Sequence, residues 1–199
     1  MIMSKEAREV NKNDIIPLEK YSKNRKQLRE DIIKFKKHRR VPLGPYATFY
    51  FECYETMLAQ IQEMLYIEKG GDSQLQDELK AYNPLIPKGK ELVATLMFEI
   101  DNPVSRTVFL NKVGEIEKKI YIQIGSEKIY SVPEQDIDRT SAEGKASSVQ
   151  FIHFNFTTEQ IKNFKDNICD VIIGIDHKEY SHQKKIPANI RIILSKDFS

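Results

Sequence analysis

The chain has 199 residues, of which 40% are apolar, and its 31 Lys and Arg against 29 Asp and Glu give a formal net charge of +2. This composition excludes a disordered chain and a fibrous repeat, and no apolar run approaches the roughly 20 residues of a membrane span. The charge is divided unevenly, because residues 20–40 hold ten basic and two acidic residues while the rest holds 21 and 27.

The N-terminal segment and the cysteines predict the compartment in which the protein resides. Residues 1–13 are polar, with no apolar signal-peptide core, and we expect a disordered tail followed by a single domain over residues 14–199. Cys53 and Cys169 form no CxxC pair and no disulfide framework, which favours a reducing compartment. We therefore expect a cytoplasmic protein.

The first half of the chain is predicted to be helical. Apolar side chains three and four residues apart predict a first helix over residues 17–40, with Arg25 as the one charge in its apolar seam. Residues 41–45 contain two prolines and a glycine and predict a turn. A second helix is expected over residues 48–69 and a third from Ser73 to residue 82, followed by an extended linker over residues 83–87.

The second half is predicted to contain a sheet. Alternation predicts strands at residues 91–100 and 148–156, a hairpin of residues 119–124 and 127–132, and a strand at 170–175. Capping residues predict short helices after Asn102 and Thr157, residues 134–146 read as a polar loop, and a last helix is expected over residues 188–198. The order predicts an α+β fold, in which N-terminal helices (14–86) pack on a mostly antiparallel sheet (90–199) with a C-terminal helix.

A polar stripe follows the second predicted helix. Glu52, Thr56, Gln60 and Glu63 fall within an arc of about 80°. The stripe is either a solvated face or a partly buried surface facing the first helix, where Arg25 would need Glu63 or Glu52 as its partner. The two glutamates stand about 16 Å apart along the helix, so they cannot share a metal ion. A cavity along the stripe would favour an enzyme or small-molecule binder, and a filled interface would exclude one.

Two further sets of residues are candidates for a site. Arg39 and Arg40 end a basic run that could bind an anion or complement the helix dipole, and nucleic-acid binding is disfavoured because no aromatic stacking motif or zinc spacing accompanies the run. His177 and Tyr180, in a loop expected after a strand, either form part of a site or anchor the next segment by hydrogen bonds. No catalytic motif or metal-ligand spacing is present, so we predict no metal or cofactor and lean against an enzyme.

Several segments, taken together, resemble one bacterial family. They are Tyr21-x-x-x-Arg25-x-x-x-Arg29, Lys36-x-x-Arg39-Arg40-Val41-x-x-Gly44-Pro45, Phe51-Glu52-x-x-x-Thr56-x-x-x-Gln60-x-x-Glu63-Met64-Leu65, Tyr82-Asn83-Pro84-Leu85-Ile86-Pro87 and His177-x-x-Tyr180. The chain thus resembles domain-of-unknown-function family 3501 over about residues 14–198. The family has no established activity, but its genes often lie near those for rubrerythrin-like proteins and iron–sulfur oxidoreductases.

The absence of a catalytic motif, together with the redox link that the resemblance implies, leads us to expect a cytoplasmic, non-catalytic accessory or binding protein that serves a redox or oxidative-stress system. Its partner would be another protein, such as an iron–sulfur oxidoreductase or a rubrerythrin-like protein. The alternative is a small-molecule-binding protein or enzyme with a polar site between the first two helices. That site would comprise Arg25, Arg29, Glu52, Thr56, Gln60 and Glu63.

Overall fold

The computed structural model describes residues 5–134, 145–166 and 168–199, which fall into two compact units. The helical unit contains the chain up to residue 38 together with residues 52–88. The sheet unit contains residues 39–51 and 89–199. The chain thus leaves the helical unit for thirteen residues and then returns to it, and each unit is described separately below.

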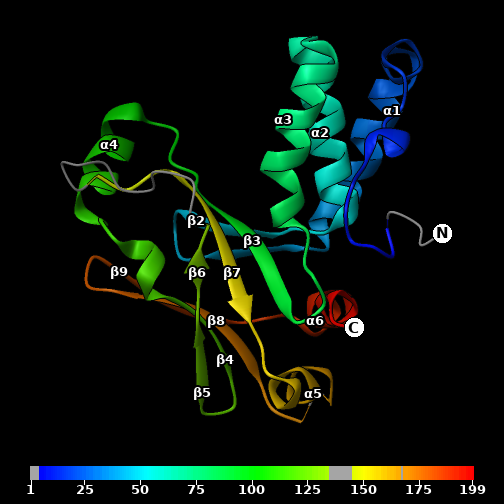
Figure 1. Ribbon diagram of the computed structural model, residues 1–199. Helices are drawn as coiled ribbons and strands as arrows, with labels where there is room; N and C mark the ends of the chain where they lie inside the picture. Colours follow the sequence, from blue (N-terminus) through cyan, green and yellow to red (C-terminus); the bar gives the residue numbers. More distant parts are fainter. Residues whose placement is uncertain (1–4, 135–144, 167) are drawn as a thin grey trace. The chain divides into compact units, whose positions relative to one another are not determined.

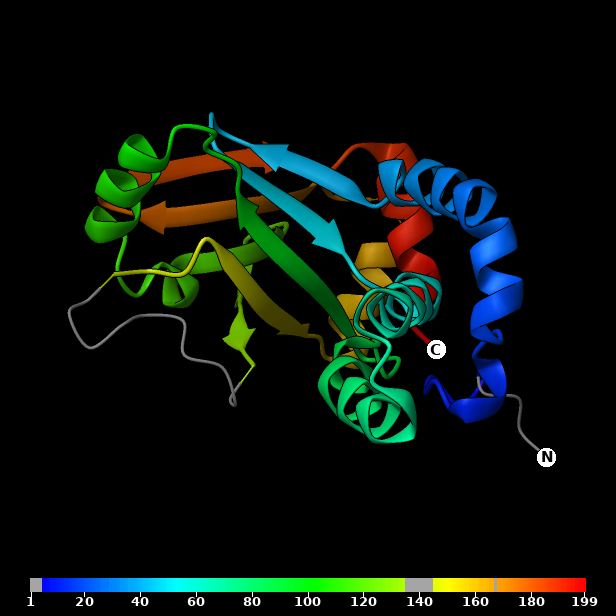
Figure 2. The ribbon, with the colours of Figure 1, turned by 90° about the horizontal axis from the view of Figure 1, so that it is seen from above.

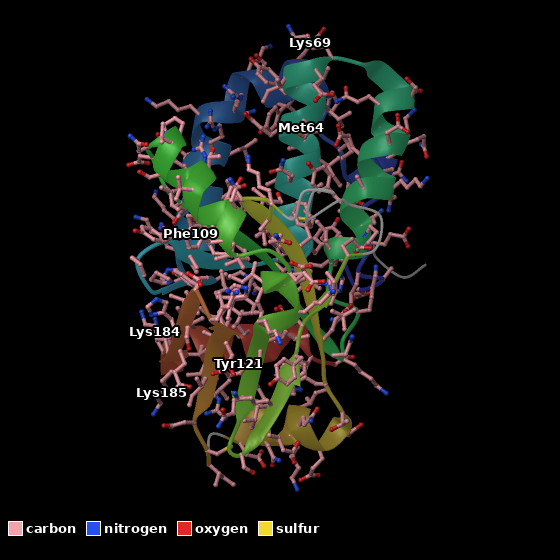
Figure 3. The ribbon with its side chains drawn as sticks, turned by 90° about the vertical axis from the view of Figure 1, so that its left-hand side faces the viewer. Met64, Lys69, Phe109, Tyr121, Lys184 and Lys185 are labelled. Carbon is pink, nitrogen blue, oxygen red and sulfur yellow. The ribbon has the colours of Figure 1, made fainter. Side chains whose placement is uncertain are left out.

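Three α-helices dominate the helical unit, seen as blue to green coils in Figure 1. Its elements are η1 (Lys12–Asp14), α1 (Leu18–Lys37), α2 (Tyr54–Glu68), α3 (Gly71–Tyr82) and η2 (Asn83–Leu85). Helix α2 buries Met57, Ile61 and Leu65 on one face. It ends where Lys69, labelled in Figure 3, adopts the left-handed conformation with φ 57°.

The segment before η1 is partly packed rather than a solvated tail. Val10 is buried, its N–H donates to Asn83 Oδ1 at 2.8 Å, and Asn83 Nδ2 donates to the Val10 carbonyl at 3.0 Å. Asn11 then caps η1 with its side chain. The predicted disordered tail therefore differs from the structure at residues 10–13, because one amide side chain satisfies both backbone groups of Val10.

Two antiparallel sheets form the sheet unit. The first has the strand order β1 (Arg40–Leu43), β2 (Ala47–Phe51), β3 (Glu91–Phe98), β7 (Val149–Asn155) and β6 (Val132–Pro133). The second has the order β5 (Glu127–Tyr130), β4 (Ile120–Ile124), β8 (Val171–His177) and β9 (Tyr180–Lys185). The helices of the sheet unit are α4 (Pro103–Lys112), η3 (Ile116–Lys119), α5 (Thr158–Asp166), α6 (Ala188–Leu194) and η4 (Ser195–Asp197).

A single apolar core joins the two sheets. Leu96 of β3 and Phe154 of β7 belong to the same buried cluster as Ile122 of β4 and Ile173 of β8. Figure 2 shows β1, β2, β3 and β7 side by side in one layer. Leu92, Ala94 and Leu96 of β3 face this core, and Val93 and Thr95 between them are buried as well, so the central strand β3 is covered on both of its faces.

Close backbone packing in the second sheet depends on a glycine. A Cβ at Gly174 of β8 would lie 2.3 Å from Cζ of Tyr121, which Figure 3 labels on β4. The Tyr121 hydroxyl donates to Gln183 Oε1 at 3.1 Å, and Lys128 Nζ stands 4.1 Å from the ring centroid. The ring therefore lies flat across β8 toward β9, in space that any larger residue at position 174 would occupy.

The α+β class and many of its elements are confirmed. The hairpin turns at Gly125 with φ 58°, as its Gly-Ser pair predicted. Asn102 caps α4, and the reciprocal bonds of Thr157 and Gln160 form the capping box before α5. The C-terminal helix is α6, and most of the predicted loop 134–146 lies outside the described residues.

The start of the second helix was predicted wrongly. Residues 47–51 form β2, which pairs with β1 and β3, and α2 begins only at Tyr54. Residues 40–43 form the edge strand β1, although Arg40 was predicted to end the first helix and residues 41–45 to form a turn. Pro42 is tolerated there because an edge strand has unpaired N–H positions. Residues 39–51 thus belong to the sheet unit rather than to a helical part spanning 14–86.

Three smaller boundaries also differ from the predictions. Helix α3 starts at Gly71, before the expected cap Ser73, and residues 83–85 form the 3₁₀ helix η2 rather than extended chain. Residues 180–185, expected to lie in a loop, form β9, which pairs with β8 through a tight hairpin. This strand was missed because its pattern is polar, since it has only Tyr180 buried and lies at the edge of the sheet.

Candidate functional site

A groove opens between α1 and α2 inside the helical unit. Its volume is about 560 Å³, within the range of small-molecule pockets. Leu28, Ile32 and Phe35 of α1 line one wall, and Leu58 and Ala59 of α2 line the other. The surface of the groove is therefore mainly apolar.

The groove is open because the two helices leave their apolar faces incompletely covered. Tyr21 is the only buried residue of α1, whereas Phe35 is 37% exposed and Leu28 and Ile32 are half-buried. These three residues belong to the apolar seam that was predicted for the first helix. An uncovered apolar stripe of this kind marks a place where a ligand or partner gains free energy by excluding water.

An ion pair lies at one end of the groove, where Glu63 is the last residue of α2 that lines it. Arg25 Nε donates to Glu63 Oε2 at 3.1 Å and Arg25 Nη2 donates to Glu63 Oε1. The Tyr21 hydroxyl donates to Glu63 Oε2 at 2.8 Å, and the Arg25 guanidinium lies 4.7 Å from the centroid of the Tyr66 ring. Of the two carboxylates expected for Arg25, the structure thus gives it Glu63, in a partly exposed rather than deeply buried pair.

These contacts set the protonation of the groove's end. The Arg25 hydrogen bonds lower the pKa of Glu63, against the opposing effect of its partial burial. Burial, and then the hydrogen bond to Glu63, raise the pKa of Tyr21 to about 12. At neutral pH the carboxylate is therefore ionised and the phenol neutral, a pairing that orients both side chains.

The other members of the predicted polar site are spread along and beyond the groove. Gln60 lines it, with Nε2 3.4 Å from the Tyr82 hydroxyl, and Arg29 lines it from α1. Thr56 is buried, where its hydroxyl accepts from Cys53 N and donates to Cys53 O at the start of α2. Glu52 is buried in the connection before α2, so it is not on the helix whose stripe it was predicted to share.

The predicted anion site at Arg39 and Arg40 lies in the sheet unit, where both side chains have internal contacts. Arg39 is buried, with Nε donating to the Phe51 carbonyl at 2.9 Å and Nη2 paired with Asp197. Arg40 lies 3.6 Å from Glu99 and stacks on the Tyr50 ring. These contacts fix β1 against β2 and η4, so a structural role accounts for both arginines.

His177 and Tyr180 flank the tight hairpin between β8 and β9. The Tyr180 hydroxyl donates to the Leu43 carbonyl at 2.6 Å and accepts the N–H groups of Ala47 at 2.9 Å and Tyr46 at 3.1 Å. His177 Nδ1 accepts the N–H of Glu179 at 3.2 Å. The anchoring interpretation, one of the two left open, accounts for these contacts.

A second, basic hollow lies beside the groove on α1. It has a volume of about 410 Å³ and is lined by Ser22, Arg25, Lys26, Arg29, Glu30, Ile33 and Tyr66. Arg29 lines both hollows. This basic cleft was missed because the sequence shows a basic helix without showing which of its lysines and arginines face a concave surface.

Neither a metal site nor a membrane-spanning helix is found in the described part of the chain. Within residues 5–134, 145–166 and 168–199, no three His, Cys, Asp or Glu side chains are placed to hold a metal ion. No helix in the same ranges combines the length and apolar character needed to cross a bilayer.

The chain is similar to proteins of one family along nearly its whole length. The family model described as "Protein of unknown function (DUF3501)" matches residues 9–198, so the chain belongs to this family. It is similar to a crystal structure of a novel protein of unknown function from Burkholderia pseudomallei K96243, at 32% identity and a TM-score of 0.89. The match covers 96% of this chain and 99% of that one. No curated protein matches the chain.

Proposed function

We propose that this protein is a binding protein whose ligand site is the groove between α1 and α2. The observation that carries the proposal is the uncovered apolar surface of the two facing helices, in a hollow of about 560 Å³. A pocket that is mostly apolar and has a few placed polar groups is the usual form of a small-molecule site. A small-molecule-binding protein is part of the alternative function that the sequence predicts for the case in which the polar stripe lines a cavity.

The polar groups of the groove favour binding over catalysis. Glu63 accepts hydrogen bonds on both carboxylate oxygens, and Arg25 lowers its pKa. A carboxylate with a lowered pKa is a weak general base, and a neutral phenol such as Tyr21 with a pKa of about 12 is a weak acid. The pair therefore serves better to shape one end of a binding site than to transfer a proton.

The proposal is tested with a neutral, apolar, fluorescent probe, N-phenyl-1-naphthylamine, whose emission rises when it leaves water. We expect saturable binding to the wild-type protein. Ala59→Phe should weaken it by at least about tenfold, because the new ring occupies the groove that Ala59 lines. The matched control is Ala81→Phe, which adds the same ring at an exposed position of α3 outside the groove.

Circular dichroism shows whether the two variants keep the helical content of the wild type. Equal probe affinity in the two folded variants, or no saturable binding to the wild type, would refute the groove as a ligand site. Loss of binding in Ala59→Phe alone supports it.

We propose further that the protein acts in the cytoplasm as an accessory to a redox or oxidative-stress system. The support is the family's gene neighbourhood, together with two cysteines that are both free. The proposed partner is an iron–sulfur oxidoreductase or a rubrerythrin-like protein encoded nearby. Isothermal titration of the purified protein against each purified candidate tests this, and no heat of binding with either would remove the redox proposal while leaving the groove proposal intact.

A further inference from the structure

We infer that the ligand of the groove is an amphipathic organic anion, with its apolar body between α1 and α2 and its anionic head group at Arg29. This inference rests on the proposed function, since it names the class of ligand for the same groove. It is carried by two cationic side chains of the groove that have no hydrogen-bond or ion-pair partner among the described residues, Arg29 and Lys36, and by the position of Arg29 in the lining of both hollows.

The acidic side chains that line the groove are largely matched by groups of the protein itself. They are Asp14, Asp31, Glu55 and Glu63. Glu63 pairs with Arg25, and Glu55 pairs with Lys5. Asp31 accepts from Gln27 Nε2 at 2.9 Å and lies 4.0 Å from Lys34, while Asp14 accepts the backbone N–H of Asn11 at 2.8 Å.

The cations of the groove have no such partners. Arg29 and Lys36 both line it, and neither side chain makes a hydrogen bond or ion pair within the described part of the chain, although Arg29 is close enough to Glu63 to help lower the pKa of that carboxyl. Arg29 is exposed, so its guanidinium keeps five donors available to a ligand. Arg29 and Lys36 are therefore the lining side chains best able to bind an anionic group of a ligand.

Helical geometry places Arg29 on the boundary between the apolar and basic surfaces of α1. At 100° per residue, Leu28, Ile32 and Phe35 cluster on one side of the helix, and Arg29 and Lys36 lie about 80° from the centre of that cluster. Lys26 lies about 60° further round, in the basic cleft that Arg29 also lines. An anionic head group at Arg29 would thus be attracted by cationic side chains of both hollows, while the apolar body of the same ligand lies in the groove.

This arrangement discriminates among amphiphiles by charge. An anion gains a charge-assisted hydrogen bond with the planar guanidinium of Arg29 and favourable interactions with Lys26 and Lys36. A neutral amphiphile of the same length gains only the burial of its chain, and a cationic one is repelled. Carboxylate and phosphate head groups share the required chemistry.

The test measures displacement of N-phenyl-1-naphthylamine by four ten-carbon amphiphiles, each below its micellar concentration. They are decanoate, decyl phosphate, decanol and decyltrimethylammonium. We expect at least one anion to bind about tenfold more tightly than decanol, and decyltrimethylammonium to bind most weakly. The preference should fall as salt is raised, because exposed charges are screened.

Variants identify the group that selects the charge. Arg29→Gln should remove most of the preference for the anion, measured as the ratio of anion to decanol affinity within that variant, whereas Arg29→Lys should retain part of it. The control is Lys23→Gln, which removes an equal charge from α1 at a position that lines neither hollow.

Each outcome bears on one of the two proposals. Probe binding without preference for an anion, or a preference that survives in Arg29→Gln, would overturn the inference and leave the groove as a binding site. Absence of probe binding would overturn the proposed function itself. An equal loss in Lys23→Gln would show that only the net charge of α1 matters, which would also overturn the role of Arg29.

Discussion

The contribution of side-chain hydrogen bonds to the stability of the sheet unit can be measured at the hydroxyl of Tyr180. It is a single oxygen that bonds three backbone groups of the β1–β2 hairpin, at Leu43, Tyr46 and Ala47. Tyr180→Phe removes this oxygen and keeps the ring, which packs against the rings of Phe98 and Phe109. The change therefore isolates the hydrogen bonds from the packing.

The expected loss follows from the groups left behind. The hydrogen bonds to Leu43 O and Ala47 N are buried, and an unsatisfied buried backbone group costs about 1–3 kcal/mol. Tyr46 N is only partly buried, so water can replace its partner at little cost. We expect the free energy of unfolding to fall by about 2–4 kcal/mol, or the melting temperature by about 5–15 °C.

Urea unfolding followed by far-UV circular dichroism measures this loss. The control is Tyr130→Phe, in a strand of the same unit, because the Tyr130 ring is 50% exposed and its loss of a hydroxyl should cost about 0.5 kcal/mol or less. A change below about 0.5 kcal/mol in Tyr180→Phe would refute the reasoning, since it would mean that water satisfies the hairpin's backbone equally well.

Two further predictions concern the same unit. Burial alone would lower the pKa of His153, but carboxylates 2.9 Å from each ring nitrogen raise that pKa above 6.5. The protonated ring therefore contributes its full stabilisation below pH 6.5, and this stabilisation is lost as the pH rises through the raised pKa. His153→Gln should therefore destabilise the protein more at about pH 5.5 than at about pH 8.5 in urea titrations, and a pH-independent difference would contradict this. Arg191 donates to three backbone carbonyls at and beyond the end of α5, so Arg191→Lys should lower the free energy of unfolding by about 1–3 kcal/mol, and an unchanged urea midpoint would contradict this.

Periodicity predicted the elements whose pattern is long and unambiguous. Residues 91–98 alternate over a full strand, and Asn102-Pro103 and Thr157 carry side-chain caps that operate locally. In each case the information lies within a few residues, so the sequence alone is sufficient. Local signals of this kind also predicted the turn at Gly125.

The β2–α2 boundary shows where local information fails. Phe51 has the spacing of one helical face with Tyr54 and Met57, and residues 47–51 lead directly into a real helix at Tyr54. What makes them a strand is pairing with β3, in which Phe51 faces Ala94 more than forty residues later. A non-local contact of this kind overrides a local pattern, because β-propensity depends on cross-strand neighbours.

The site was partly predictable for the same reasons. A charge inside the apolar seam of α1 requires a carboxylate, which pointed to Glu63 as one of two partners for Arg25. The groove itself was not predictable, because Leu28, Ile32 and Phe35 have the same spacing whether the neighbouring helix covers them or stands apart. Burial depends on the separation of two helices, and the spacing of apolar residues along one helix does not encode it.

The excursion of residues 39–51 into the sheet unit determines how the protein can be dissected. A fragment that stops at Lys88 would contain every helix of the helical unit, yet it would also contain β1 and β2 without β3. The edge of β2 and the side chains of Phe49 and Phe51 would then face water, which invites pairing between molecules. Truncation at the apparent boundary therefore yields an aggregating fragment, and the groove is best isolated by replacing residues 39–51 with a short polar linker.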